Sequence, residues 1–432
     1  MDSGAMEDAL DRARKLGARG CELLFDHATA HELTLTRGRA QAAPASESSH
    51  LDLTVWLDDG RRGKVRGDAD DFESLLEKAL AAAAGAEPSP GSGPVDRLRP
   101  VVGGLGIADR RFGHLDTEAR AEVIEEAARS VKSEDKRCRP TGLRYRDEVR
   151  LRRFANSKGV RLEERSTRYD AWGTVELGEL ALGEHVASRA FASVASFPFG
   201  TALARRAVEL SMNGEQLDGV VKAMLPPRTV ARIIEAIGDA FTVERLSGEQ
   251  PFFAVRRDDG SAPLDEQLHL LDDGKLPGGL HTRSFDDRGV VPVPLTFLRE
   301  GAADQAMVTP AQARRDGVTP TGHVRGDALG CGNLALKAGT RSMNATYTDH
   351  DTWSLEVDDL DLSGLDLATG VARVTLDGRV MKSNEQRGAM RRVGAVVDLS
   401  RMLANVLKVC SDTDRIRAVD APALFVDGLE LT

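Results

Sequence analysis

The sequence predicts a protein of the α+β class, with a small N-terminal α/β unit, a mixed α/β middle region and a largely β C-terminal domain. Helix-spaced and strand-like segments alternate through the first half of the chain, whereas the second half consists mainly of short extended runs between turn residues. A segment rich in proline, glycine and serine at residues 85–94 separates the first unit from the rest. The 432 residues are enough for two or three domains with buried cores.

The first predicted domain covers residues 1–86 and contains two helices and three extended segments. The helices are expected at about 6–16 and 72–84, and the extended segments at about 22–26, 32–36 and 51–57. Asp59 and Gly60 follow the last of these segments and indicate a hairpin turn. A linker is predicted at residues 87–106.

The central domain is predicted at residues 107–222 and begins with a helix at about 117–132. Asp116 is placed to cap that helix. Strand-like stretches then dominate, and a second amphipathic helix closes the domain; these segments are expected at about 143–155, 160–169, 174–180, 186–194 and, for the helix, 201–212.

The C-terminal domain is predicted at residues 223–432, entered through a short strand at about 219–225. Extended runs are expected at about 291–298, 371–381 and 424–429, the second of them a hairpin that turns at Asp377 and Gly378. One helix is expected at about 399–409.

Composition argues against several classes of partner. Against 58 lysines and arginines stand 68 aspartates and glutamates, a net charge of −10, and aromatic residues make up 4% of the chain. Neither a basic surface nor stacking platforms for nucleic acid are therefore expected. The chain shows no secretory signal and no apolar run long enough for a bilayer. Its four cysteines are widely spaced, so we expect free thiols and a cytoplasmic location.

Residues 226–241 have the outline of a metallopeptidase helix without its metal ligands. A catalytic zinc helix supplies two histidines and a glutamate that activates water. Here Ile234, Glu235 and Asp239 stand where such a motif would have His, Glu and His. Ile234 cannot bind a metal ion and Asp239 alone is a poor zinc site, so no metal is expected. An amphipathic helix with Ile234 in the core accounts for every residue.

Other metal-like or nucleotide-like features have structural explanations. His27 and His31 are predicted on a strand, where residues four apart lie about 13 Å from each other, too far to share one ion. The Gly-Glu-His phrase ending at His185 is interpreted in the same way. Residues 330–335 match a dinucleotide fingerprint without the strand and βαβ unit that it requires. Cys331 within them has no predicted base.

The densest polar loop lies at residues 271–290. Four of its residues, Arg283, Phe285, Asp286 and Asp287, are candidates for substrate binding. Long polar loops often carry function, so the loop could line a peptide cleft. It could equally be an ordered connection between strands, with aspartates that cap turns. Both interpretations remain open at this level.

Taken together, several segments resemble the TldD/PmbA family over nearly the whole chain. The most specific is the loop at 277–292, with its Pro-Gly-Gly start and the sequence Ser-Phe-Asp-Asp-Arg-Gly-Val. The others are the Asn-Ser-Lys-Gly turn at 156–159, the segment 220–227 that follows an alanine-rich helix, and the closing stretch 368–428.

This resemblance implies a fold, a partner and a function. The family forms heterodimers in which a TldD-type subunit carries zinc on His-Glu-x-x-x-His, whereas the TldE/PmbA type lacks those ligands. Because the motif falls on Ile234, Glu235 and Asp239, the resemblance implies a metal-free TldE/PmbA-type subunit. Zinc is expected in the partner, and peptidase activity on small or unfolded peptides only in the complex. Such complexes are associated with maturation of a peptide antibiotic that acts on DNA gyrase.

Two alternatives remain open. The chain could be a metal-free homodimer that binds peptides or a partner protein without a protease role. It could also be an enzyme with a rearranged site that uses Glu235, Asp239 or a cysteine. Neither alternative involves nucleic acid or a membrane.

Overall fold

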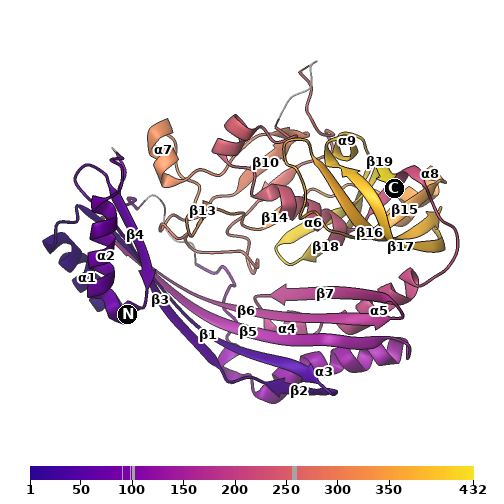
Figure 1. Cartoon of the computed structure of the whole chain (residues 1–432), viewed down its shortest axis with the longest axis horizontal. Coiled ribbons are helices and arrows are strands. Elements are labelled where there is room, and N and C mark those ends of the chain that lie inside the picture. The colour runs from indigo at the N-terminus through magenta and orange to yellow at the C-terminus, as the bar shows by residue number, and fades with distance from the viewer. Residues whose placement is uncertain (90, 98, 100–102, 255–259) are drawn as a thin grey trace.

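Two antiparallel-rich sheets organise the chain (Figure 1). The computed structural model describes residues 1–89, 91–97, 99, 103–254 and 260–432. Positions 90, 98 and 100–102 of the predicted linker lie outside the described residues. Within the described part of the chain, no helix is long and apolar enough to cross a membrane.

The first sheet joins the N-terminal unit to the central region. Its strand order is β4-β3-β1-β5-β6-β7, with β2 paired to β1. The strands are β1 (Gly20–Thr36), β2 (Arg39–Ala42), β3 (Ser46–Trp56), β4 (Arg62–Gly67), β5 (Arg139–Asn156), β6 (Arg161–Leu177) and β7 (Leu180–Ser188). β1 pairs with both β3 and β5, so the predicted domains at 1–86 and 107–222 share one continuous sheet.

Helices cover this sheet in two places (Figure 1). At one end lie α1 (Ser3–Lys15) and α2 (Phe72–Ala84), which pack on β1, β3 and β4. Along the long strands lie α3 (Thr117–Glu134), α4 (Phe191–Ala195) and α5 (Phe199–Leu210). Short helical turns are η1 (Ala69–Asp71), η2 (Phe112–His114) and η3 (Arg245–Glu249).

Alternation along β5 and β6 gives this sheet two different faces. Tyr145 and Tyr169 belong to the core under α3, and Asp147 bonds Arg120 of α3 at 2.7 Å. Successive side chains on a strand point to opposite faces. The residues of even number, such as Phe154 and Glu164, therefore face the C-terminal region, where Phe154 meets that region's loop at 271–290.

The second sheet has ten strands in the order β11-β10-β9-β14-β19-β17-β16-β15-β8, with β18 paired to β19. β8 also pairs with β19, so β8, β15, β16, β17 and β19 close on themselves. The strands are β8 (Gly219–Leu225), β9 (Leu270–Asp272), β10 (Leu295–Arg299), β11 (Ala302–Ala303), β14 (Leu334–Leu336), β15 (Trp353–Leu360), β16 (Val371–Lys382), β17 (Glu385–Asp398), β18 (Val406–Ile416) and β19 (Val419–Leu431). A separate small ribbon pairs β12 (Val324–Arg325) with β13 (Ala328–Leu329).

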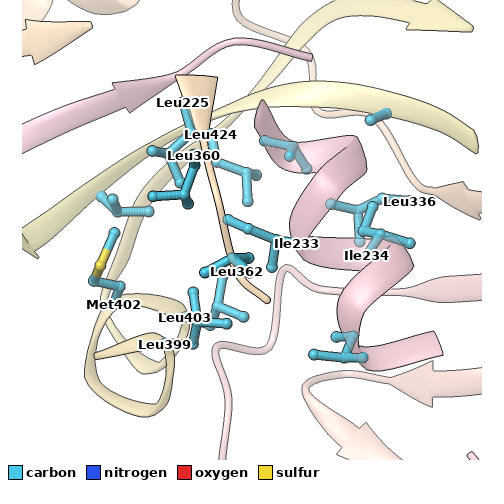
Figure 2. Close-up of a cluster of buried hydrophobic side chains, with 14 of the residues drawn as sticks. Leu225, Ile233, Ile234, Leu336, Leu360, Leu362, Leu399, Met402, Leu403 and Leu424 are labelled. Atoms are coloured by element: carbon cyan, nitrogen blue, oxygen red, sulfur yellow. The ribbon is translucent and has the colours of Figure 1, made fainter. Parts of the chain in front are cut away.

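Helix α6 (Pro227–Gly238) packs its apolar face into the core of this sheet. The other helices of the region are α7 (Pro310–Asp316), α8 (Met343–His350) and α9 (Leu399–Ala404). Figure 2 shows Ile234 beside Leu336 and Ile233 on the side toward Leu362. Just after α6, Phe241 stacks on Phe253 and Phe297 with ring centroids 4.5 and 4.6 Å apart.

The predicted fold class is confirmed, including the largely β C-terminal region, but several boundaries differ. The domain boundary expected between residues 222 and 223 falls inside β8, which pairs with the C-terminal strands β15 and β19. The hairpin predicted at Asp377 and Gly378 is wrong, because β16 continues through them with a register shift and turns at Ser383. The helix expected at 399–409 ends at Ala404, and β18 follows.

Two strands are much longer than predicted. The expected pairs 22–26 and 32–36, and 160–169 and 174–180, are the single strands β1 and β6. β6 continues through Gly173, and the glycine is there for a packing reason. A Cβ there would lie 2.9 Å from the Phe199 ring and 2.4 Å from Leu143, so only glycine fits under α5.

Phe241→Ala should destabilise the C-terminal core by about 3–5 kcal/mol, because it removes a fully buried ring from a stack of three. The midpoint of urea unfolding, monitored by circular dichroism, measures the effect. The matched control is Phe197→Ala, since Phe197 is 45% exposed and should cost much less. Equal shifts for the two variants would contradict this account of the core.

Candidate functional site

A cleft of about 730 Å³ lies between the first sheet, hereafter the central sheet, and helix α6. One wall is formed by β6 and β7, and the opposite wall by the polar face of α6. The turn between β18 and β19 closes one side. Side chains that line it include Trp172, Glu184, His185, Arg228, Arg232, Glu235, Asp359 and Arg417. The amphipathic helix predicted at 226–241 is confirmed, and its polar face lies on this cleft.

A partly buried ion network holds the two walls of the cleft together. Glu184 on β7 accepts hydrogen bonds from Arg206 of α5 at 3.0 Å and Arg228 of α6 at 2.9 Å. Arg206 also bonds Asp358 of β15 at 2.6 Å. Because four elements meet at these charges, the width of the cleft is set by packing that neither region makes alone.

The histidine of the Gly-Glu-His phrase belongs to the cleft wall. The His185 ring stacks on Trp172 with centroids 4.9 Å apart. Its Nε2 lies 2.8 Å from Oδ1 of Asp170, and the other oxygen of that carboxylate accepts from Arg168 at 2.7 Å. The ring therefore has a local partner and presents a flat aromatic surface next to the cleft.

The positions of the metallopeptidase motif carry structural contacts. Ile234 is 3% exposed and lies beside Leu336 (Figure 2). Glu235 forms an ion pair with Arg417, and Asp239 accepts the backbone N–H of Cys331 at 3.0 Å. A zinc ion does not fit this donor set, because one position is hydrocarbon and both carboxylates already have partners. Across the described ranges, no group of three or more His, Cys, Asp or Glu could hold a metal ion.

The other motifs of the sequence are also structural. His27 and His31 both lie on β1, and Nδ1 of His31 lies 2.7 Å from Asp147. Residues 330–333 connect β13 to β14, and residues 334–335 belong to β14, so the segment does not open a helix as a dinucleotide site requires. The Cys331 thiol is buried, and burial raises its pKa well above the ordinary value. Such a thiol is a poor nucleophile at neutral pH.

Within the loop at 271–290, Phe285 and Asp286 are interior residues. Asp286 is 1% exposed. One of its oxygens accepts the N–H groups of Arg288 and Val290 at 2.9 Å, and the other accepts that of Val324 at 3.0 Å. Burial outweighs these bonds and raises the pKa of Asp286 to about 6. Asp286 therefore shapes the loop as a cap.

The buried residue Arg152 of β5 anchors the same loop to the central sheet. Its guanidinium donates to the Phe285 carbonyl at 3.2 Å, pairs with Asp287 and lies 5.1 Å above the Phe285 ring. Asp287 also pairs with Arg283 at 3.0 Å. Arg283 is one of the four predicted substrate-binding residues. Its side chain lines a second, smaller cavity between this loop and the sheet.

Several residues around these cavities were missed by sequence reasoning. Trp172, Arg152, Arg189 and Arg325 come from separate segments and match no motif. The sequence Arg-Asp-Glu-Val-Arg-Leu-Arg-Arg at 146–153 could have indicated them. A strand inside a sheet rarely carries so many arginines, so this segment pointed to a charged site on the sheet.

Ile234→His should destabilise the chain by about 2–4 kcal/mol, because it places an imidazole without a hydrogen-bond partner in an apolar core. Urea unfolding measures the loss. The matched control Ile234→Val should cost only about 0.5–1.5 kcal/mol. A histidine variant as stable as the valine variant would show that position 234 has access to solvent.

Asp286 should make stability fall as the pH rises from about 4 to about 6. Its pKa is raised from 3.8 to about 6 in the folded chain, so the folded state binds the proton more tightly than the unfolded state. The loss amounts to about 3 kcal/mol at most. Urea unfolding from pH 4 to 7 should show the stability difference, wild type minus Asp286→Asn, decreasing with pH. An increasing difference would contradict the raised pKa.

Two regions of the chain match models of known protein families. Residues 110–214 match the family model described as the PmbA/TldA metallopeptidase central domain, and residues 218–432 match the corresponding C-terminal domain. No curated protein matches the chain. The two models together cover well over half of the sequence and meet just before β8.

Solved structures share the fold over the whole chain. A protein from Bacteroides thetaiotaomicron VPI-5482, described as a modulator of DNA gyrase, has a TM-score of 0.85 at 16% identity, with 99% of this chain and 98% of that chain covered. A protein from Thermotoga maritima MSB8 with the same description has a TM-score of 0.82 at 18% identity and 99% coverage of both. TldE from Thermococcus kodakarensis has a TM-score of 0.79 at 15% identity, with coverage of 99% and 100%. The matched domains show that this chain belongs to the TldD/PmbA family.

Proposed function

We propose that the chain is a TldE/PmbA-type, non-catalytic subunit of a TldD/TldE-like zinc metallopeptidase that acts on small or unfolded peptides. One observation carries the proposal: the motif positions Ile234, Glu235 and Asp239 serve the core, an ion pair and a backbone hydrogen bond. The similarity in fold to TldE from Thermococcus kodakarensis supports the same subtype.

Catalysis is assigned to a TldD-type partner because positions 234, 235 and 239 of this chain offer no free zinc ligand and no free general base. A zinc site needs nitrogen or sulfur ligands, and the general base must be free to accept a proton from water. Glu235 has Arg417 as its ion-pair partner. Zinc is therefore expected in the partner, and the heterodimer is expected to be cytoplasmic.

The contribution of this chain would be one wall of the peptide site. The cleft of about 730 Å³ offers a flat aromatic surface at Trp172 and charged side chains on α6. An extended peptide could lie along it, with its main chain beside the edge of β7. The loop at 271–290 stands next to this wall and carries Arg283 toward the adjacent cavity.

Co-expression with a TldD-type subunit that has an intact His-Glu-x-x-x-His motif tests the assignment. The purified single chain should contain no stoichiometric zinc and should cleave no peptide. The purified pair should contain about one zinc per heterodimer and show chelator-sensitive cleavage of an unfolded peptide. Metal analysis by mass spectrometry and a peptidase assay provide the readouts. Stoichiometric zinc with chelator-sensitive cleavage by the single chain would overturn the proposal.

A variant pair tests the wall itself. Trp172→Ala in the complex should raise KM about 3–10-fold and leave the zinc content unchanged, because an aromatic contact contributes about 1 kcal/mol. Trp353→Ala is the matched control, since Trp353 on β15 is 41% exposed and does not line the cleft. If no TldD-type protein binds and the single chain still binds peptides, the peptide-binding homodimer replaces this proposal.

A further inference from the structure

A second cavity, of about 170 Å³, lies between the central sheet and the loops of the C-terminal region. Its walls come from β5, β6, the end of β7, the loop at 271–290 and the β12 ribbon. Six arginines line it: Arg150, Arg152, Arg168, Arg189, Arg283 and Arg325. Only two lining residues, Glu148 and Glu164, are carboxylates. We call it the arginine cavity.

Carboxylates neutralise four of these arginines. Arg150 pairs with Glu148 at 2.9 Å, and Arg168 bonds Asp170 at 2.7 Å. Arg152 pairs with Asp287 and lies 3.6 Å from Glu164, and Arg283 pairs with Asp287 at 3.0 Å. The neighbouring Glu164 accepts both the N–H and the hydroxyl of Ser284, which engages one of its oxygens in holding the loop.

Arg189 and Arg325 have only main-chain partners among the described residues. Arg189 donates to the carbonyls of Thr167 at 3.0 Å and Thr282 at 3.2 Å. Arg325 donates to the carbonyl of Cys331. Within the described ranges, neither guanidinium lies within 4 Å of a carboxylate, so the cavity holds two positive charges without a matching anion.

The surroundings make these charges costly. Burial lowers the pKa of Arg189 to about 10; Glu164 opposes this shift, and the charges of Arg168, Arg150 and Arg325 add to it. Burial, followed by the charges of Arg325, Arg168 and Arg189, lowers the pKa of His281 on the cavity wall to about 3, so this ring is neutral at pH 7. Arginines remain charged at that pH, and like charges in a poorly solvated site repel one another. Clusters of this kind are typical of sites whose ligand supplies the opposite charge.

We propose that the arginine cavity binds the oxyanion of a small ligand, a carboxylate or a phosphate group, between Arg325 and Arg189. Guanidinium groups match the geometry of both anions and bond them in pairs. The volume of the cavity also fits such a group. A cavity that holds one water has a volume of about 10–15 Å³, so a cavity of 170 Å³ admits a group of several heavy atoms. The Ser166 hydroxyl on β6 lines the same space and can donate to an anion.

The cavity adjoins the peptide cleft along one face of β6. Arg168 lines the cavity, Asp170 bonds both Arg168 and His185, and His185 lines the cleft. The anion therefore has two possible sources. One is the free C-terminal carboxylate of a peptide that lies in the cleft, and this source rests on the proposed function. The other is free phosphate, which does not.

Binding to the purified single chain tests the site without a partner or an activity assay. The probes are inorganic phosphate and a short peptide as the free acid or the C-terminal amide, at an ionic strength held constant with sodium chloride. Calorimetry should show saturable binding of phosphate or of the free acid, and at least tenfold weaker binding of the amide. Arg325→Gln should weaken binding at least tenfold, and Arg325→Lys should restore part of it. Arg373→Gln on the exposed side of β16 is the matched control and should bind like the wild type.

Binding of phosphate alone identifies a free oxyanion, and binding of the free acid alone identifies a peptide carboxylate; either outcome supports the site. No saturable binding of any probe, or equal binding by Arg325→Gln and the wild type, would overturn it. If Arg325→Gln fails to fold, labelling of the wild type with phenylglyoxal replaces it. Peptide mass spectrometry should then show ligand protection of Arg325 and not of Arg373, and unchanged labelling of Arg325 would overturn the proposal.

Discussion

The contact between Arg152 and the loop at 271–290 is the constraint that joins the C-terminal region to the first sheet, and the arginine cavity depends on it. One buried guanidinium bonds the Phe285 carbonyl, pairs with Asp287 and covers the Phe285 ring. A charge this deeply buried is tolerated only because its hydrogen bonds and its ion pair are made together. The contact holds the C-terminal loop on the central sheet. The arginine cavity is the space that remains beside it.

Helix α6 connects the core of the C-terminal region to the cleft. Its apolar face, including Ile234, fills the core of the C-terminal sheet, and its polar face lines the cleft. Asp239 directly after it secures the segment around Cys331 by a backbone hydrogen bond. Each position of the helix therefore has a structural contact, in the core, at the cleft or with a neighbouring loop.

Much of the fold and part of the candidate site could be predicted from local pattern. The predicted helices at 72–84 and 117–132 match α2 and α3 closely, because the helical spacing of apolar residues and caps such as Asp116 act within a few residues. The polar loop was recognisable as unusual. Its inner organisation was not, because three backbone N–H groups converge on Asp286, one of them from Val324. That arrangement depends on chain segments nearly forty residues apart.

By itself, the sequence determined the fold class, the amphipathic character of α6 and the family loop, because periodicity, turn chemistry and residue identity are local properties. Tertiary structure alone decided that β1 joins the first two predicted domains in one sheet and that Gly173 continues a strand. It also decided that Arg189 and Arg325 line one cavity without a carboxylate partner among the described residues. Charge balance in a cavity depends on which distant side chains share a small, poorly solvated volume, and no local pattern encodes that.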